Sequence, residues 1–374
     1  MSRAHAVLSA SSSSRWIACP PSALLQEKYR DYGSVYAEAG SEAHALGESK
    51  VLEFLGKPHT DPRPEMKYLD QEMEDATDAY ASFIDEQVAT AKETCPDPLV
   101  LVEQEVDYSR WAEGGFGTAD AIIVGEGHLW ITDLKYGTGI EIDAQSNSQL
   151  SCYALGAIDL LDDLYDFHTV TLSIFQPRRS HISSWTTTRE ALLDWGENVL
   201  HPAAQLAIKG EGKLCAGDHC RFCKAKHECR VRADQQMNLM RYEFQLPPTL
   251  TDDEVEEILG QVDQLVSWAE DIKTYALTAA LGGKRWKTYK LVEGRSTRRY
   301  SDENAVAEAV KAVGKDPYER RLLGVTAMTQ LLGRKQFNEI LGGLIVKPRG
   351  KPCLVPLSDK RPAIDNNDNE YEGD

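Results

Sequence analysis

Three short segments rich in valine, isoleucine and aromatic residues follow one another closely, and they constrain the fold more than any other feature. They span residues 99–108, 117–124 and 128–136, and glycines at positions 114, 115, 125 and 127 separate them. β-Branched and aromatic residues favour strands, and glycine is typical of tight connections between antiparallel neighbours. The segments therefore predict a β-meander.

Segments whose apolar residues recur at helical spacing surround this meander. Before it, the sequence predicts helices over residues 37–55 and 65–92, which a proline-rich stretch separates. After it, the sequence predicts a helix over 146–164, strands over 169–176 and 182–187, and a helix over 189–208. This order of helices and strands predicts an α/β fold.

The 374 residues exceed the usual size of one domain, so we expect two. A cysteine-rich segment at 215–229 leads into a predicted helix that ends near residue 243, and Pro247 and Pro248 indicate a linker. Beyond it we expect a long amphipathic helix over 252–281, a basic strand over 284–300 and two short helices. The predicted domains are residues 1–245, closed by the cysteines, and a smaller α+β domain, residues 246–374, with an acidic tail.

Composition narrows the setting in which this chain works. No apolar run reaches the roughly 18 residues that a membrane span needs, and the N-terminus lacks the apolar core of a secretory signal. We therefore expect a soluble cytoplasmic protein without a membrane partner. Eight cysteines in such a compartment favour metal or redox chemistry over disulfides. The net charge of −18 excludes a generally DNA-coating surface, so nucleic acid would need a local basic path.

Two carboxylates and one lysine lie on neighbouring predicted strands. Asp120 ends the sequence GTAD, and Asp133 and Lys135 belong to DLK on the next strand. Side chains two apart on a strand share a face, and antiparallel pairing can bring Asp120 beside them. Carboxylate oxygens suit Mg²⁺ or Mn²⁺, and a nearby ammonium can position a water or stabilise charge. These three residues favour a site for metal-assisted hydrolysis. The alternative is that they are ordinary charged residues that face solvent from the strands.

The strands carrying GTAD and DLKYG and the helix carrying QLSCY resemble the RecB-like PD-(D/E)XK nucleases. This resemblance implies a restriction-endonuclease-like core, with a mixed central sheet flanked by helices. It also implies a set of site residues. The metal ligands would be His44 in GSEAHAL, Asp120, Asp133 and the main-chain carbonyl of Leu134; the catalytic residues would be Asp120, Asp133, Lys135 and Glu103, with Glu105 as the alternative to Glu103; and Gln149 and Tyr153 would contact the DNA backbone or brace the site.

The sequence CRFCKAKHEC places Cys220, Cys223 and Cys229 close enough to share one metal centre. AddB-type relatives in this family are similar here, and the resemblance implies a [4Fe–4S] cluster whose first ligand is Cys19. A zinc site completed locally by Cys215, His219 or His227 is the alternative. The isolated cysteines at positions 95, 152 and 353 receive no role.

A basic segment with interleaved aromatic rings occupies residues 284–299 and is a candidate DNA-binding groove, or else a solvated hairpin. The residues assigned to DNA contact are Lys284, Arg285, Lys287, Arg298 and Arg299. A second basic stretch spans residues 347–361. This C-terminal third resembles the extension of phage and prophage members of the nuclease family.

The sequence therefore predicts an Mg²⁺- or Mn²⁺-dependent DNA nuclease, an exonuclease of phage-type recombination or replication in a bacterial or phage-infected cell. No Walker A motif is present, so DNA degradation would need no ATP from this chain. DNA is the expected substrate, and a single-strand-binding or annealing protein is a candidate partner. The alternatives are a non-catalytic, metal-stabilised DNA-binding scaffold and a zinc-knuckle interaction protein.

Overall fold

The computed structural model describes residues 6–29, 35–239, 249–293, 300–318, 322–346, 354–357, 359 and 362. The chain divides into two compact units, Met1–Ala276 and Leu277–Asp374. The domain boundary predicted after residue 245 falls within 240–248, outside the described residues. The first unit contains the sheet and both groups of candidate metal ligands.

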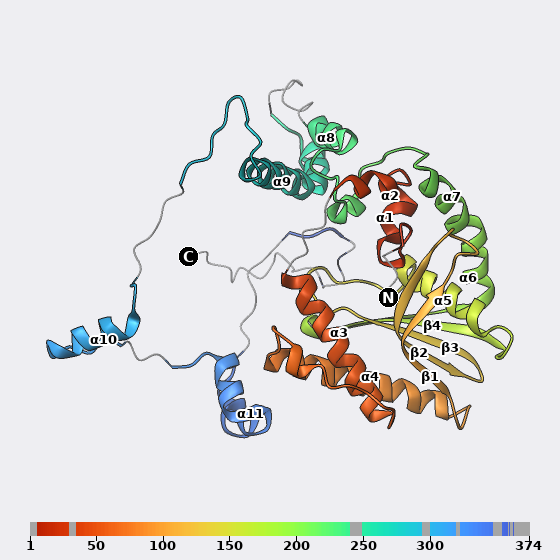
Figure 1. Ribbon diagram of the computed structural model, residues 1–374, viewed down its shortest axis with the longest axis horizontal. Coiled ribbons are helices and arrows are strands. Elements are labelled where there is room, and N and C mark those ends of the chain that lie inside the picture. Colours follow the sequence, from red (N-terminus) through yellow and green to blue (C-terminus); the bar gives the residue numbers. More distant parts are fainter. Residues whose placement is uncertain are drawn as a thin grey trace. The chain divides into compact units, whose positions relative to one another are not determined.

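The first unit is built on a five-stranded mixed sheet (Figure 1). Its strands are β1 (Leu99–Asp107), β2 (Phe116–Gly125), β3 (Gly127–Leu134), β4 (Phe167–Gln176) and β5 (His181–Thr188). They lie in the order β1-β2-β3-β4-β5, and every neighbouring pair is antiparallel except β3 and β4, which are parallel. The predicted meander and the two later strands are confirmed.

The connections follow from the strand directions. The β2–β3 hairpin turns at Gly127, whose φ of 70° favours glycine. Parallel neighbours need a crossover, and α5 (Ser148–Leu161) connects β3 to β4. The side chain of Asn147 accepts a hydrogen bond from the Leu150 amide and so caps the start of this helix.

Helices cover both faces of the sheet, because alternate residues of β2 and β3 point in opposite directions. Ile122 and Ile131 pack with the apolar residues of α5, whereas Ile123 and Trp130 pack with Tyr80 of α4. The helices of the first layer are α1 (Ser13–Ala18), α2 (Ser22–Leu25), α5, α6 (Arg189–Trp195) and α7 (His201–Lys209); those of the second are α3 (Val35–Phe54) and α4 (Gln71–Lys92) (Figure 1). The fold is a mixed α/β structure with its sheet between helical layers.

The second predicted helix begins six residues later than expected. Asp70 accepts a hydrogen bond from the Met73 amide and caps α4 at Gln71, while Arg63–Glu65 form a separate 3-10 turn. A capping aspartate satisfies an otherwise unpaired amide, which is why the helix starts there and not at residue 65. The helix predicted over 189–208 is continuous except for a π-helical stretch, Gly196–Leu200, between α6 and α7.

The cysteine-rich segment leads into α8 (Arg230–Met237), and α9 (Asp252–Leu281) is the predicted long helix. The basic strand predicted over 284–300 is wrong for residues 284–293, which form no strand. Strands need partners, and the charged, exposed residues of this segment offer no apolar face to bury. The described part of the second unit contains α10 (Glu303–Ala312) and α11 (Val325–Leu341) and no strand, so it does not show the predicted α+β character.

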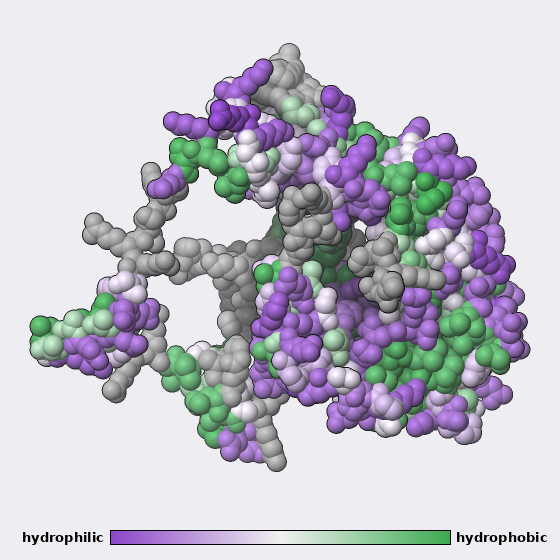
Figure 2. All heavy atoms as spheres, viewed as in Figure 1, coloured by the Kyte–Doolittle hydropathy of each residue, from purple (hydrophilic) through white to green (hydrophobic). Residues whose placement is uncertain are grey.

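Hydrophilic side chains cover much of the rim of the first unit (Figure 2), in keeping with the acidic composition. Among the described helices, none combines the length and hydropathy required to cross a bilayer.

Candidate active site

The carboxylates of Asp120 and Asp133 meet at one end of the β2–β3 pair. Ala121 lies opposite Thr132, so the next residues along each strand, Asp120 and Asp133, lie beside each other. Both residues are buried, with exposed fractions of 6% and 1%. The Leu134 amide donates a hydrogen bond of 2.6 Å to Asp120 Oδ2, so the sheet backbone itself orients this carboxylate.

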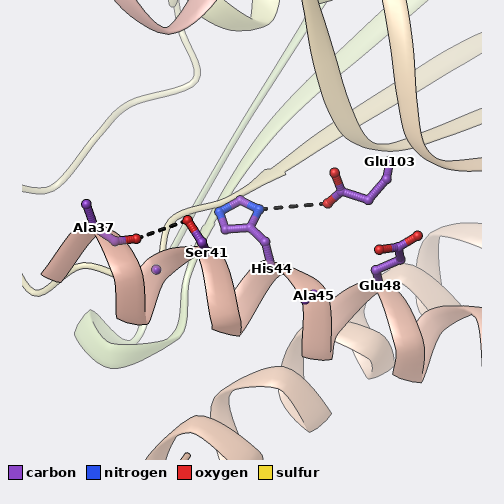
Figure 3. A pocket seen from close by; sticks show the side chains of 7 residues that line it. Ala37, Ser41, His44, Ala45, Glu48 and Glu103 are labelled. Carbon is purple, nitrogen blue, oxygen red and sulfur yellow. Dashed lines mark hydrogen bonds and ion pairs between the residues drawn. The ribbon is translucent and has the colours of Figure 1, made fainter. Parts of the chain in front are cut away.

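His44 reaches the same point from α3. Its Nδ1 lies 3.2 Å from Asp120 Oδ1. The same nitrogen lies 3.9 Å from Glu103 Oε1 (Figure 3). Gly47, nearly one turn later, permits this approach, because a Cβ there would lie 3.2 Å from Tyr80 Cδ1 and 3.4 Å from Leu134 Cδ2. A Cβ at position 47 would require the Tyr80 ring to shift by a few tenths of an ångström, so glycine fits this close contact between α3 and the residues beneath it.

Glu103 joins the cluster from a locally distorted position on β1. Its φ is 48°, in the left-handed region that non-glycine residues rarely adopt, and the regular pairing with β2 skips it between Val102 and Gln104. Such outliers persist where the surrounding structure enforces them, and they are common at functional sites. Val102 pairs with Ala121 and Gln104 with Ala119, so Glu103 falls opposite Asp120, and its side chain points toward His44 (Figure 3), whereas Glu105 is exposed.

Two side chains contact Asp133, the cation of Lys135 and the neutral amide of Gln149. Lys135 Nζ lies 2.7 Å from Asp133 Oδ2, and Gln149 Nε2 donates a hydrogen bond of 2.8 Å to Asp133 Oδ1. The same amide nitrogen of Gln149 lies 3.0 Å from the hydroxyl of Tyr153, which is 6% exposed. Gln149 therefore braces the site, and Tyr153 packs behind it within the core.

The crowding of acids raises several pKa values. Burial, followed by the negative charge of Asp120, raises the pKa of Glu103 to about 7. Burial also raises the pKa of Asp133, although the neighbouring Lys135 opposes this shift. For His44, burial is the largest single influence and disfavours the charged ring, but the hydrogen bond to Asp120 and the negative charges of Asp120 and Asp133 together raise its pKa to about 9. The site therefore retains protons that a bound cation would displace.

These donors suit a divalent ion. One ligand atom from each of His44, Glu103 and Asp120 can be chosen so that all three lie within 4.8 Å of one another. Asp133 Oδ2 is buried and makes no hydrogen bond to the described residues, although Lys135 lies beside it. An open cleft of about 460 Å³, lined by Ala37, Gly40, Ser41, His44, Ala45, Glu48 and Glu103, leads to the cluster (Figure 3). The residues present fit a hard cation with oxygen and imidazole ligands.

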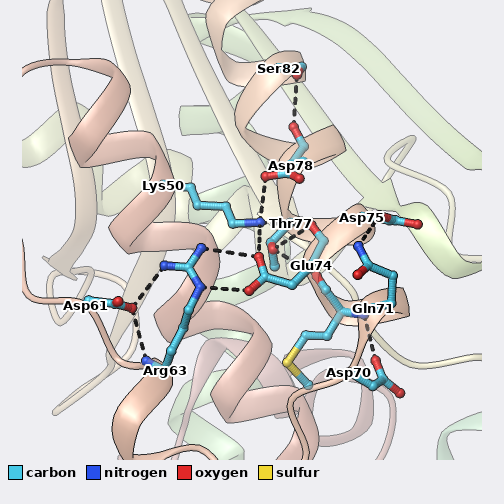
Figure 4. A network of polar contacts seen from close by, with 11 residues as sticks. Lys50, Asp61, Arg63, Asp70, Gln71, Glu74, Asp75, Thr77, Asp78 and Ser82 are labelled. Atoms are coloured by element: carbon cyan, nitrogen blue, oxygen red, sulfur yellow. Dashed lines mark hydrogen bonds and ion pairs between the residues drawn. The ribbon is translucent and has the colours of Figure 1, made fainter. Parts of the chain in front are cut away.

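An ion-pair network centred on the buried Lys50 joins α3 to α4 (Figure 4). Lys50 of α3 is 8% exposed, and its Nζ lies 2.7 Å from Glu74 Oε2 and 2.6 Å from Asp78 Oδ1. Arg63 Nε donates a 2.7 Å hydrogen bond to Glu74 Oε1. This network holds the helix that carries His44, and sequence reasoning missed it because its members are scattered over two helices and a loop.

The N-terminal Cys19 lies beside the cysteine-rich segment, as the resemblance implied. Ligand atoms of Cys19, Cys215 and His219 lie within 4.8 Å of one another, and Cys215 Sγ donates a 2.7 Å hydrogen bond to the Ala18 carbonyl. Hydrogen bonds to Cys19 and Cys220 raise the pKa of His219 to about 11. Burial is the largest single influence on Cys19 and opposes its ionisation, but hydrogen bonds from His219 and from the backbone of Cys215 and Ser22, with the charge of His219, together lower the pKa of the thiol.

The remaining predicted cysteine ligands occupy the same segment. Cys220 and Cys223 are 7% and 8% exposed, and the more exposed Cys229 precedes the first turn of α8. A cluster would space its thiolates more widely than the ligands of one ion, so the close group of Cys19, Cys215 and His219 favours a single ion. The buried set of Cys19, Cys220 and Cys223 suits either centre.

The predicted DNA-binding residues of the C-terminal segment are only partly described. Lys284, Arg285 and Lys287 are exposed, and Lys284 Nζ lies 4.3 Å from the centre of the Trp286 ring. Arg298 and Arg299 lie outside the described residues, as do the basic residues of 347–353 and those at 360 and 361. Lys284 and its neighbours belong to the second unit, whereas the site on the sheet belongs to the first.

Residues 5–362 match the family described as "Protein of unknown function (DUF2800)". Among solved structures, the crystal structure of SSO0001 shares 15% identity with this chain, covering 50% of this chain and 95% of that one, with a TM-score of 0.22. A TM-score of this size carries no argument about fold or function. Because the family match spans nearly the whole sequence, the chain belongs to the DUF2800 family.

Proposed function

We propose that this protein is an Mg²⁺- or Mn²⁺-dependent nuclease that hydrolyses DNA phosphodiester bonds. One observation carries the proposal: His44, Glu103 and Asp120 converge beside Asp133 and Lys135 at the end of the β2–β3 pair. A histidine, three acids and a lysine combine ligands for a hard cation with a group that can act on a water molecule.

The topology supports assigning the core to the PD-(D/E)XK type. The acids lie on the second and third strands of an antiparallel meander, and a helix then crosses over to a strand parallel to the third. The residues identified through the RecB-like resemblance come from α3, β1, β2, β3 and α5, and they meet at one point. A chance distribution of surface charges would not produce this convergence from five elements.

Each residue has a role that its contacts support. His44, Asp120, Asp133 and the carbonyl of Leu134 would hold the cation, which when bound polarises the scissile phosphate and lowers the pKa of a bound water. Lys135, beside Asp133, would orient the attacking water and offset charge that develops on the phosphate. Glu103, whose pKa is about 7, can accept a proton near neutral pH. Gln149 keeps Asp133 in place.

The substrate assignment rests on the resemblance and on local charge. The net charge of −18 leaves a DNA strand to depend on a limited basic path, for which Lys284, Arg285 and Lys287 are candidates in the second unit. We propose an ATP-independent exonuclease of phage-type recombination, with a single-strand-binding or annealing protein as a candidate partner.

The cysteine module, defined as Cys19 with residues 215–229, is proposed to hold a structural metal centre. Cys19, Cys220, Cys223 and Cys229 would bind a [4Fe–4S] cluster, closing a long loop around the nuclease core. The proximity of Cys215 and His219 to Cys19 supports zinc as the alternative.

The nuclease proposal is tested with the purified full chain, Mn²⁺ and DNA labelled at either the 5′ or the 3′ end, both single- and double-stranded. Asp133→Ala should abolish Mn²⁺-dependent loss of label. Glu126→Gln, on the exposed turn of the same hairpin, is the matched control and should act like the wild type. Equal rates for Asp133→Ala and wild type would refute the catalytic assignment.

A further inference from the structure

Among the described residues of the first unit, three cations are buried, and they differ in how their charge is offset. Lys50 pairs with Glu74 and Asp78, and Arg232 pairs with Asp271 at 2.6 Å. The third, Arg15 of α1, is 3% exposed. Within the described part of the chain, no carboxylate lies within ion-pairing distance of Arg15.

The hydrogen bonds of Arg15 do not replace that missing charge. Its Nη1 lies 3.2 Å from the carbonyl and 3.4 Å from the hydroxyl of Ser22, and both acceptors are neutral. A buried cation without a counter-charge is costly, so such cations are normally paired or neutralised. The guanidinium cannot readily give up its proton, because its pKa is far above neutrality. Its counter-charge must therefore come from another chemical group.

The helix that carries Arg15 lies among the cysteines: α1 packs against the 3-10 helix Asp218–Phe222, which contains Cys220 and is followed by Cys223. Arg15 lies one helical turn before Cys19, whose amide donates a 2.8 Å hydrogen bond to the Arg15 carbonyl. Burial lowers the pKa of Arg15, and negative charge on Cys223 and Cys19 opposes that shift. Cys19 and Cys223 are far apart in the sequence, and both residues are buried. Neutral thiols would leave the guanidinium uncompensated, whereas metal-bound thiolates would offset it.

The possible metal centres differ in net charge, and this charge decides which of them could offset Arg15. A divalent zinc ion with two thiolates and two neutral imidazoles has no net charge. A zinc ion with three or four thiolates, or a [4Fe–4S] cluster with four, is anionic. Only the anionic centres give Arg15 a counter-charge. The buried arginine thus argues against a neutral zinc knuckle and for a thiolate-rich centre.

We propose that Arg15 is the counter-cation of an anionic metal–thiolate centre formed by Cys19, Cys220, Cys223 and a fourth cysteine. The inference rests on the proposed metal centre of the cysteine module and is independent of the nuclease proposal. Arg15 is a tuning residue: it binds no metal, and its charge stabilises the thiolates that do.

The experiment uses the full chain purified without oxygen. Iron, acid-labile sulfide and zinc contents identify the centre, and the rate of metal release to a chelator measures its stability. Arg15→Met should release metal about 10- to 100-fold faster than wild type, the range expected for a residue that supports metal ligands. Arg15→Lys, which keeps the charge, should stay close to wild type. Arg110→Met, which removes a mostly exposed arginine on the β1–β2 connection, is the control and should also behave like wild type.

If the centre contains iron and sulfide, removal of the positive charge should also lower its reduction potential, because adding an electron becomes less favourable. Arg15→Gln, which retains a donor toward Ser22, gives a second neutral variant if the methionine variant does not fold. Equal release rates for the neutral Arg15 variants and Arg110→Met would overturn the role of Arg15 alone. A wild-type chain with neither iron nor zinc would overturn the metal centre and this role together, while Mn²⁺-dependent DNA hydrolysis would still be measured separately.

Discussion

The two candidate metal sites of the first unit are built in opposite ways. The candidate active site lies on β2, β3 and α3. There, a backbone amide donates a hydrogen bond to Asp120, and the side chain of Gln149 donates one to Asp133. The cysteine module instead lies in 3-10 and turn structure, and many of its backbone hydrogen bonds are local, such as Cys220 to Gly217 and Cys223 to Cys220. The sheet can preorganise the first site without metal. The second, if it binds a metal as proposed, would depend on that metal to hold distant segments together.

The largest effect expected from this contrast is on catalysis. Asp120→Asn keeps the shape of the side chain but removes the charge that faces His44. We expect DNA hydrolysis to fall by roughly 10²- to 10³-fold, with little change in melting temperature, because the sheet supports the site. Initial rates in Mn²⁺ and thermal melts measure the two quantities. Asp97→Asn, an exposed residue before β1, is the control, and an equal loss of rate in both variants would contradict the assignment.

The cysteine module should show the reverse pattern. Cys220→Ser removes a buried candidate ligand, so we expect the melting temperature to fall by roughly 10 °C, because metal binding there contributes folding free energy. The matched variant is Cys95→Ser, at an isolated and partly exposed cysteine. Thermal unfolding followed by circular dichroism provides the measurement. If Cys220→Ser and Cys95→Ser have the same melting temperature, the module does not hold a structural metal.

A smaller effect is expected where a side chain only braces a ligand. Gln149→Ala leaves Asp133 Oδ1 without its amide donor, and we expect Mn²⁺ affinity to fall about tenfold. Isothermal titration of metal-free protein with Mn²⁺ measures this directly. Gln205→Ala removes an exposed glutamine of α7 and should bind Mn²⁺ like the wild type. Unchanged affinity in Gln149→Ala would mean that the sheet alone fixes Asp133.

The smallest effect is a pH dependence of the metal-free protein. Folding raises the pKa of Glu103 from 4.5 to about 7 and that of His44 from 6.5 to about 9. The folded state then holds more protons than the unfolded state, so the free energy of unfolding falls as pH rises from about 5 to 9. Melts in chelator at several pH values should show this decline, and His44→Gln combined with Glu103→Gln should flatten it. A wild-type stability that rises over this range would contradict the electrostatic account.

The strands and most helices could be predicted because their patterns are local. The apolar run of β2 and β3 and the Gly127 turn define the hairpin that carries Asp120 and Asp133. Helix starts were less predictable: the cap at Asp70 competes with the helical pattern that begins at residue 65. The strand expected at 284–293 was wrong because basic and aromatic residues indicate a surface, and they do not by themselves provide strand partners.

The site was predictable in its residue types and less so in its supports. The motifs of the family resemblance identified His44 as a candidate. The position of His44 depends on Gly47 and on the ion pairs of Lys50, which follow from the packing between α3 and α4. The left-handed φ of Glu103 and the exposure of Glu105 are visible only in the folded strand, so the sequence left Glu105 as an alternative. The unpaired charge of Arg15 likewise becomes visible only when burial and neighbours are known.

The most direct test of the central claim is a titration of the metal-stripped full chain with Mn²⁺ while the release of nucleotides from end-labelled DNA is followed. Our account predicts no release in chelator and a saturable recovery as Mn²⁺ is added. Hydrolysis that is independent of Mn²⁺, or absent at every Mn²⁺ and Mg²⁺ concentration, would contradict the assignment of His44, Glu103, Asp120 and Asp133 to a metal-dependent nuclease site.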